Sequence, residues 1–465
     1  MVCGCCQPPS PDPNRRRVMR TGAWLIAGLG LSRGVTLPTP AEAQGRRQTL
    51  IRDAEIERTL WAMSSPIFRA ANLPPATISI FIVSDRRINA FVAAGRNMFL
   101  NTGLIMELET PDELIGVIAH EAGHIAGGHT ARRQQEINAA AGPALIGTLL
   151  GIAAAAAGAP EVGLAAIAGS QSVAIRNLLR YSRGEEAAAD QAALGYLRRS
   201  GTSPEGLRRV LQRFRGQEVL SVGNLDPYTL THPLSTDRLQ LIERAADEAA
   251  GQNFPAQPER DYWHARMRAK LQGFLDRPER VLDRTADDPD SELNLYARAV
   301  AHHRLPDPAR AVETVDRLIA IRASDPFYIE LKGQILYEAG NARAAEPLYR
   351  EAARLEPREP LLLAGLGRVL LAVGGEANER EALGVLEQAR RSDPADISMM
   401  RDLAIAYDRA GDRGMATLVT AERYALSGRV RDARLHAGRA EQVLPQGSPG
   451  WLRAQDILAM KEPDR

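Results

Sequence analysis

VIAHEAGHIA, residues 117–126, is the stretch that decides the fold, because it sets two histidines four residues apart in an apolar, helix-compatible segment. Positions four apart lie about 40° apart around an α-helix and one turn along it, so the imidazoles of His120 and His124 can face one metal ion. Glu121 lies about 100° round the helix, where a general base would reach a water on the metal. The spacing predicts a zinc site that activates water.

An ordinary helix that happens to carry two histidines is the alternative interpretation. The neighbours of the motif argue against it, because Val117, Ile118 and Ile125 would bury the histidines and the glutamate in apolar surroundings. Burial of such groups is unfavourable unless their polar atoms are satisfied, and a metal ion satisfies them.

A catalytic zinc needs a third protein ligand and keeps one position open for water. On a continuing helix His129 would point about 140° away from His124, so we expect it beside a ligand or in a structural role rather than on the metal. A better source is the alanine-rich segment 181–190, which places Glu186 and Asp190 on one helical face, four residues apart. A carboxylate from this second helix would complete the site.

Three motifs, in this order, resemble the zinc metallopeptidase family of the CAAX prenyl protease type. They are His-Glu-x-x-His at 120–124, Ser-Arg-x-x-Glu-x-x-Ala-Asp at 182–190, and Thr-His-Pro at 231–233 with Arg238 after it. The resemblance is to the soluble periplasmic BepA-like (YfgC-like) branch, which carries C-terminal tetratricopeptide repeats. It implies one Zn²⁺ per chain, with the ligands His120, His124 and Glu186.

The same resemblance implies roles for four other residues. Glu121 would be the base, and Asp190 would orient a ligand histidine. His232 matches a histidine that can approach the metal and hold the site inactive, and Arg238 matches an arginine near the substrate. As catalytic groups, either could stabilise a developing oxyanion. A plain turn before a helix is the alternative for His232.

A β-hairpin is expected just before the metal helix. Residues 77–83 alternate with β-branched side chains and predict a strand, and residues 88–92 and 98–102 flank a glycine-containing turn. In zinc proteases of this general class, an edge strand beside the metal helix binds the substrate backbone as an added strand. The predicted substrate-binding residues are Met98, Phe99, Leu100 and Asn101. A purely structural hairpin is the alternative.

Composition limits the class of protein. The chain has 465 residues, 45% of them hydrophobic and 5% aromatic, with a formal net charge of +1. This length allows two or three domains. A near-neutral charge and the lack of a basic tract with interleaved aromatics give no reason to expect nucleic acid.

The first 43 residues have the features of an export signal. Arginines at 15–17 precede an apolar core at 23–31 and a small-residue cleavage site at 41–43. About 10 apolar residues are too few to span a bilayer, which needs about 20. All three cysteines precede the cleavage site, so the mature chain is expected to be neither a thiol protease nor an all-thiolate zinc protein. We expect a periplasmic protein cleaved near Ala43, exported by either the general secretory or the twin-arginine route.

Residues 139–169 form an apolar stretch whose only charge is Glu161, and 139–159 is long enough to cross a membrane. The stretch allows three interpretations: a mobile or buried helical cover over the active site, membrane contact or insertion, or an oligomer interface. Interrupting glycines, one followed by Pro143, and flanks without an aromatic belt favour the cover.

The C-terminal third has an internal period. Gly340, Gly374 and Gly411 recur at similar points, 34 and then 37 residues apart. The period resembles tetratricopeptide repeats, helix pairs that stack into a curved solenoid. Degenerate pairs are expected at 295–321 and 416–443. A concave surface for peptide or protein partners follows, with a dimerisation or packing platform as the alternative.

These features predict a mostly α (α+β) protein: a gluzincin-like metalloprotease domain with a small β-hairpin or sheet, then an α-helical solenoid. The expected division is a signal peptide (1–43), the protease domain (44–250), a linker with connecting helices (251–290) and the repeat domain (291–460).

The expected function is zinc-dependent hydrolysis of misfolded or stalled envelope proteins. The repeats would recruit these substrates or the outer-membrane assembly machinery, and residues 139–169 could add peripheral membrane contact. The alternatives are a metal-bound chaperone or scaffold with little proteolysis, and an integral-membrane protease.

Overall fold

The computed structural model describes residues 50–93, 95–132, 182–215 and 227–461. The predicted signal peptide and the apolar stretch 139–169 lie outside these ranges. Among the described residues, no helix combines the length and the apolarity needed to cross a membrane.

A four-stranded sheet carries the first part of the fold. Its strands are β1 (Leu50–Ile51), β2 (Ser79–Val83), β3 (Ala90–Ala93) and β4 (Asn97–Asn101), in the spatial order β1-β2-β4-β3. β2 runs parallel to β4, while β3 pairs antiparallel with it, and Phe91 lies opposite Phe99. The predicted strand at 77–83 and the predicted hairpin are confirmed.

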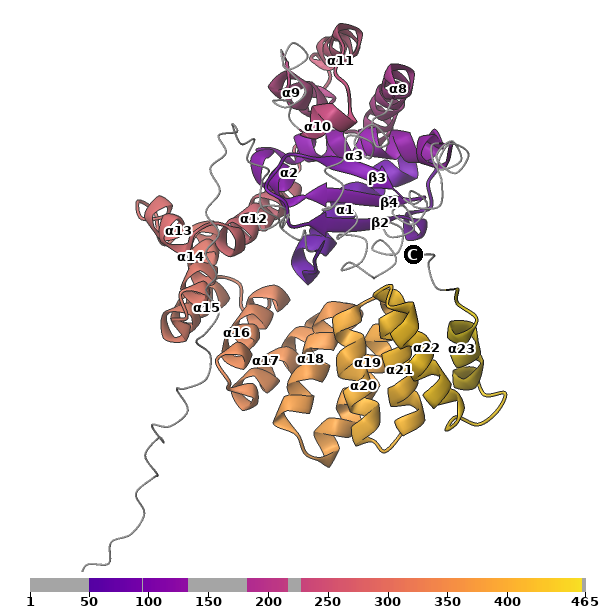
Figure 1. The fold of residues 1–465 in the computed structure, drawn as a ribbon. Helices are drawn as coiled ribbons and strands as arrows, with labels where there is room; N and C mark the ends of the chain where they lie inside the picture. The colour runs from indigo at the N-terminus through magenta and orange to yellow at the C-terminus, as the bar shows by residue number, and fades with distance from the viewer. Residues whose placement is uncertain (1–49, 94, 133–181, 216–226, 462–465) are drawn as a thin grey trace, which may run out of the picture. The chain divides into compact units, whose positions relative to one another are not determined.

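The helices of this part have the following bounds: α1 (Ala54–Ala70), α2 (Thr102–Glu107), α3 (Pro111–Ala126), α8 (Arg183–Ser200), α9 (Glu205–Arg213), α10 (Pro227–Thr231) and α11 (Thr236–Ala249). Figure 1 shows α1 and α3 beside the strands of the sheet.

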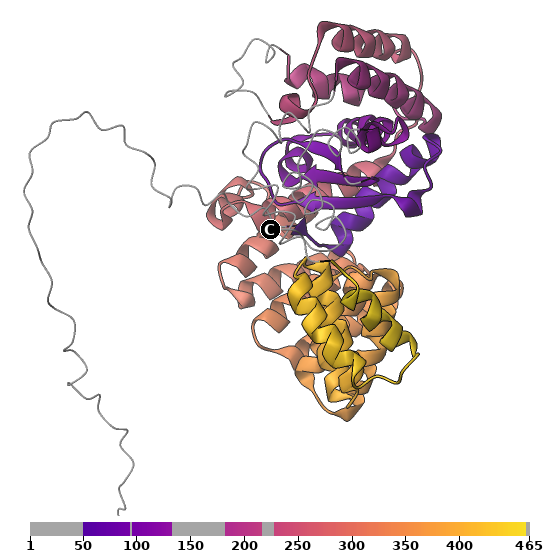
Figure 2. The same ribbon diagram turned by 45° about the vertical axis from the view of Figure 1, so that its right-hand side comes forward.

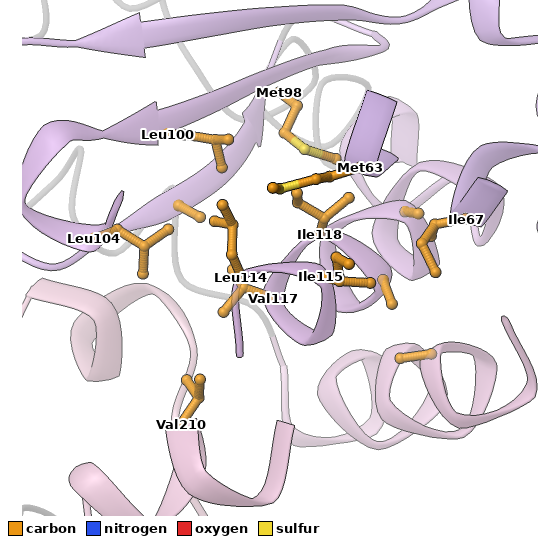
Figure 3. Close-up of a cluster of buried hydrophobic side chains, with 14 of the residues drawn as sticks. Met63, Ile67, Met98, Leu100, Leu104, Leu114, Ile115, Val117, Ile118 and Val210 are labelled. Carbon is orange, nitrogen blue, oxygen red and sulfur yellow. The ribbon is translucent and has the colours of Figure 1, made fainter. Parts of the chain in front are cut away.

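The core lies between one face of the sheet and the helices α1 and α3. Because successive residues of a strand point to opposite faces, Met98 and Leu100 share a face. Figure 3 shows both pointing toward Met63 of α1 and Leu114 of α3. These four side chains are at most 4% exposed. On the other face of the sheet, the ring of Phe99 stacks between those of Phe81 and Phe91, at centroid distances of 5.2 and 4.9 Å.

Helix α3 begins with a complete set of start signals. The Thr110 side chain accepts from the backbone N–H of Glu113, whose carboxylate accepts from the backbone N–H of Thr110 in return, and Pro111 takes the first position. Every residue from Glu113 to Ile125 is buried. A helix buried on all sides carries the two histidines into the interior, where their polar atoms need partners.

The C-terminal part consists of paired helices. After α12 (Pro258–Leu275) and α13 (Pro278–Arg284) come α14 (Glu292–Arg304), α15 (Pro308–Ile321), α16 (Pro326–Glu338), α17 (Ala342–Leu355), α18 (Pro360–Val373), α19 (Glu376–Ser392), α20 (Ile397–Arg409), α21 (Arg413–Leu426), α22 (Val430–Glu441) and α23 (Pro449–Leu458). Figures 1 and 2 show the orange-to-yellow helices α16 to α23 following one another as a stack.

The three periodic glycines mark equivalent turns in this stack. Gly340, Gly374 and Gly411 follow α16, α18 and α20, and their φ angles of +84°, +74° and +82° lie in the left-handed region that glycine adopts without strain. The predicted solenoid is thus confirmed, and so is the mostly helical fold class with a small sheet. The domain boundaries stay a prediction.

One prediction about the sheet is wrong. The strand β4, which holds the predicted substrate residues Met98, Phe99, Leu100 and Asn101, is a central strand, because β2 pairs with it on one side and β3 on the other. A central strand has no unpaired edge to offer a substrate backbone. The edge strand on this side of the sheet is β3.

Candidate active site

Three segments far apart in the sequence bring the predicted metal ligands together. Helix α3 supplies His120 and His124, helix α8 supplies Glu186, and His232 follows directly after α10. All four side chains are at most 1% exposed. They form a group in which one ligand atom of each residue lies within 4.8 Å of the others.

A glycine inside the motif allows the close approach of α8. A Cβ built on Gly123 would lie 2.8 Å from the backbone oxygen of Ala189, which is too short for any side chain. The absent side chain lets α8 pack directly on the turn that separates His120 from His124. Glu186 and Asp190, on either side of Ala189, thereby reach the two histidines.

The distances between the converging atoms fit a tetrahedral metal. His124 Nε2 lies 3.1 Å from His120 Nε2 and 3.2 Å from Glu186 Oε1. His232 Nδ1 lies 3.3 Å from His120 Nε2 and 3.2 Å from Glu186 Oε1. Ligands about 2.0–2.1 Å from zinc in a tetrahedron are about 3.4 Å apart, so these residues fit the ion.

Partners behind the ligands orient them. His120 Nδ1 lies 2.8 Å from Asp190 Oδ1, the aspartate for which an orienting role was predicted. His124 Nδ1 lies 2.9 Å from His129 Nδ1, and His232 Nε2 lies 3.1 Å from the carbonyl oxygen of Ala90. Each imidazole therefore presents one nitrogen to the common centre while its other nitrogen is held from behind.

The carboxylate of Glu121 is buried without hydrogen bonds among the described residues, as suits a general base that awaits a water. Among the described residues, no group hydrogen-bonds to either carboxylate oxygen, although both oxygens are buried. His232 Nε2 lies 3.3 Å from Oε1. A buried carboxylate without hydrogen bonds is unfavourable unless a further group binds there, and a water beside the metal position would supply the missing donor.

The pKa values of Glu121 and Glu186 shift in opposite directions. Burial raises the pKa of Glu121 above its ordinary value. Burial acts in the same direction on Glu186, but electrostatic interactions with the neighbouring His232 and Arg238 side chains outweigh it and hold the pKa of Glu186 well below its ordinary value. Glu186 is thus favoured as an ionised ligand, and Glu121 as a group that can take up a proton.

Arg238 lies against two carboxylates of the site. It is 2% exposed and donates from Nε and Nη2 to the Asp190 carboxylate, at 2.6 and 3.0 Å. Its Nη1 lies 2.5 Å from Glu186 Oε2 and donates to the carbonyl oxygen of Pro233. These contacts make Arg238 a support for two site carboxylates.

Two contributors were not anticipated from the sequence. The backbone carbonyl of Ala90 on β3 accepts from His232, and the ring of Tyr228 on α10 packs on the His232 imidazole at a centroid distance of 4.8 Å. A backbone carbonyl leaves no signal in a sequence. Tyr228 lies four residues before His232, a helical spacing that could have indicated the contact.

The site agrees with a family model. Residues 51–246 match the model of Peptidase family M48. The match contains all the residues of the site described above. The geometry and this match together make the protein a metalloendopeptidase, and they agree with the resemblance seen in the three motifs.

Curated relatives extend the similarity over most of the chain. The beta-barrel assembly-enhancing protease of Yersinia pestis is 26% identical, over 88% of this chain and 86% of that protein. The protein of the same name in Escherichia coli K12 is 25% identical, over 92% of this chain and 89% of that protein. The metalloprotease LoiP of Escherichia coli K12 is 29% identical over 41% of this chain.

Proposed function

We propose that the protein is a zinc-dependent endopeptidase of the cell envelope that hydrolyses misfolded or stalled outer-membrane and periplasmic proteins. The observation that carries the proposal is the convergence of His120, His124, Glu186 and His232 around one centre beside the buried carboxylate of Glu121. Two relatives named for β-barrel assembly, similar over most of the chain, support the choice of substrate class.

His120, His124 and Glu186 would hold zinc. When bound, zinc polarises the scissile carbonyl and lowers the pKa of water to about 7. Glu121 takes the proton from the attacking water and later delivers it to the leaving amine. Asp190 accepts from His120 and keeps that ligand oriented, while Arg238 holds Asp190 in place and lies against Glu186.

We place the substrate backbone along β3 instead of β4. Asn101 N donates to Asn89 O, so the backbone groups of Asn89 face β4. Along an antiparallel strand, residues whose backbone N–H and C=O face the partner strand alternate with residues whose groups face away from it. The carbonyl of Ala90 therefore points away from β4, toward the position of an added strand. In the structure this carbonyl accepts from His232 Nε2. A substrate strand that pairs with Ala90 would have to displace His232.

His232 thus supports a closed resting state. Its Nδ1 takes the fourth corner of the group, the position that a catalytic metal keeps for water or substrate. Its Nε2 holds the strand edge that the substrate would use. We propose that movement of His232 opens both positions together. The same closed arrangement is what favours the second candidate function, a metal-bound scaffold with little proteolysis.

Removal of the metal tests the hydrolytic proposal. We expect about one zinc per chain in the purified protein, loss of casein digestion after chelation, and recovery when zinc is returned, because Glu121 alone cannot activate water sufficiently. Zinc content is measured by mass spectrometry of the metal, and digestion by release of labelled peptides. Full activity in protein stripped of metal would contradict the proposal.

Substitution of His232 tests the closed state. The variant His232→Ala frees both the fourth corner and the Ala90 carbonyl, so we expect faster casein digestion than in the parent, about tenfold for each 1.4 kcal/mol that the closed state contributes. The control is His303→Ala, which changes a histidine of the repeat part that pairs with Glu338. A slower His232→Ala enzyme with unchanged zinc content would instead assign His232 to transition-state stabilisation.

The repeats and the envelope location complete the proposal. The helices α14 to α23 stack as a solenoid, which offers an extended surface for polypeptides. We propose that they bring substrates or the outer-membrane assembly machinery to the protease, and that the chain works in the periplasm after removal of residues 1–43.

A further inference from the structure

His129 lies against the second zinc ligand although a continuing helix would have carried it away. Helix α3 ends at Ala126, and Gly128 has a φ of +64°, which turns the chain back. The rings of His124 and His129 then meet edge to face, with centroids 5.0 Å apart and planes at 73°. Their Nδ1 atoms are 2.9 Å apart, and His129 is 4% exposed.

Gly127 provides the space for this contact. A Cβ on Gly127 would lie 2.5 Å from His129 Nε2 and 2.8 Å from its Cε1. The backbone of Gly127 itself is ordinary, with φ −71° and ψ −10°, so the residue is not needed for its conformational freedom. What the position requires is the absence of a side chain, because the His129 ring lies directly over it.

The chemistry of the pair assigns a role to each nitrogen. Because His124 Nε2 faces the metal position, its lone pair is needed there and the proton of the neutral ring lies on Nδ1. This N–H needs an acceptor, and the atom opposite it is His129 Nδ1. The other two histidines also have an acceptor at the ring nitrogen that faces away from the metal position. His120 Nδ1 faces Asp190 Oδ1, and His232 Nε2 faces the carbonyl oxygen of Ala90.

We propose that His129 is a positioning residue for zinc: it accepts the Nδ1–H of His124 and fixes that ligand in the tautomer and orientation that present Nε2 to the ion. Gly127 makes the contact possible. The inference rests on the proposed zinc site and deepens it, since it names a residue on which metal affinity depends although the residue does not touch the metal.

The test compares zinc affinity with the stability of the metal-free protein. We measure the zinc Kd of the full chain by competition with a chromophoric chelator, and the Tm of the same protein without metal. His129→Ala and Gly127→Ala are each expected to weaken zinc binding about 10–100-fold, the range for loss of a partner behind a ligand. The Tm of the metal-free protein should stay close to that of the parent.

Further variants separate positioning from packing. His129→Gln supplies a side-chain oxygen that can accept the same N–H, so it should recover most of the affinity that His129→Ala loses. Gly184→Ala is the matched glycine control, because a Cβ there meets no atom within 4 Å, and it should bind zinc like the parent.

Three results would overturn the inference. Affinity equal to that of the parent in both His129→Ala and Gly127→Ala would show that the contact does not position the ligand. A fall in the Tm of the metal-free protein that accounts for the weaker binding, without recovery in His129→Gln, would make His129 a packing residue. A parent protein that binds no zinc would overturn the proposed function itself and this inference with it.

Discussion

Replacement of Glu121 by glutamine is expected to lower kcat for peptide hydrolysis by about 10²–10⁴-fold, the usual contribution of a general base, while zinc stays bound. Glutamine has the same shape as glutamate but cannot accept the proton of the attacking water. Both Glu121 oxygens are buried and lack hydrogen bonds among the described residues, so the substitution removes no hydrogen bond to them. The three proposed zinc ligands are unchanged.

Kinetics and zinc content measured on the same preparation check this result. The control is Glu248→Gln, an exposed glutamate on α11, which should behave like the parent. The same variant, tested in cells, also distinguishes the peptidase from the scaffold function. If the Glu121→Gln protein rescues a deletion strain as fully as the parent does, hydrolysis is not the main task and the scaffold function is favoured.

Replacement of Arg266 by leucine is expected to lower the free energy of unfolding by about 3–5 kcal/mol, the cost of breaking a buried ion pair from one side. Arg266 on α12 is fully buried and donates from Nε to Glu55 of α1, at 2.8 Å. Its Nη2 donates to Asp325 at the start of α16, also at 2.8 Å. Its guanidinium lies 3.8 Å from the ring centre of Tyr328.

The expected loss of stability comes from the buried carboxylates that remain after Arg266 is removed. Without Arg266, the buried Glu55 keeps Lys270 and Tyr296 as partners, but Asp325 loses both of its contacts to the guanidinium. Because Glu55 lies within residues 51–246 and Asp325 precedes the repeat helix α16, the network joins the region matched to the peptidase family with the solenoid. Its loss should also loosen that connection.

Denaturant unfolding of the metal-free protein measures the effect. The control is Arg380→Ala, which removes a surface ion pair with Glu376 and should change the free energy of unfolding by no more than about 1 kcal/mol. A double variant, Asp325→Asn with Arg266→Leu, should recover part of the loss, because the carboxylate charge that loses the guanidinium is then removed. A change in Arg266→Leu as small as that in the control would contradict the assignment.

Most of the proposed metal site could be predicted from the sequence, because its residues come in pairs that each lie on a single helix. Two histidines one helical turn apart fix their own geometry, and Glu186 and Asp190 lie on a common helical face by spacing alone. The resemblance of three ordered motifs then added Glu186 as the specific third ligand. The glycine period of the C-terminal third gave the solenoid in the same way, since each glycine ends a helix of its own repeat.

The substrate strand could not be predicted in this way. Alternation of residues shows which side chains share a face of a strand, but the neighbours of that strand are set by pairing between distant segments. Residues 79–83 pair with 97–101 and make β4 a central strand. The edge of the sheet beside the proposed metal site therefore belongs to β3, although both strands come from the same predicted hairpin.

The sequence by itself determined which chemical groups this protein could bring together: two imidazoles and a carboxylate on one helix, a carboxylate on a second helix, and a periodic helical array. Only the tertiary structure decided the surroundings of those groups. It ended α3 at Ala126 and turned His129 back onto His124, and it directed Arg238 to Asp190. The physical reason is that ligand spacing follows from the geometry of one helix, whereas partners behind the ligands come from contacts between segments whose packing no local pattern specifies.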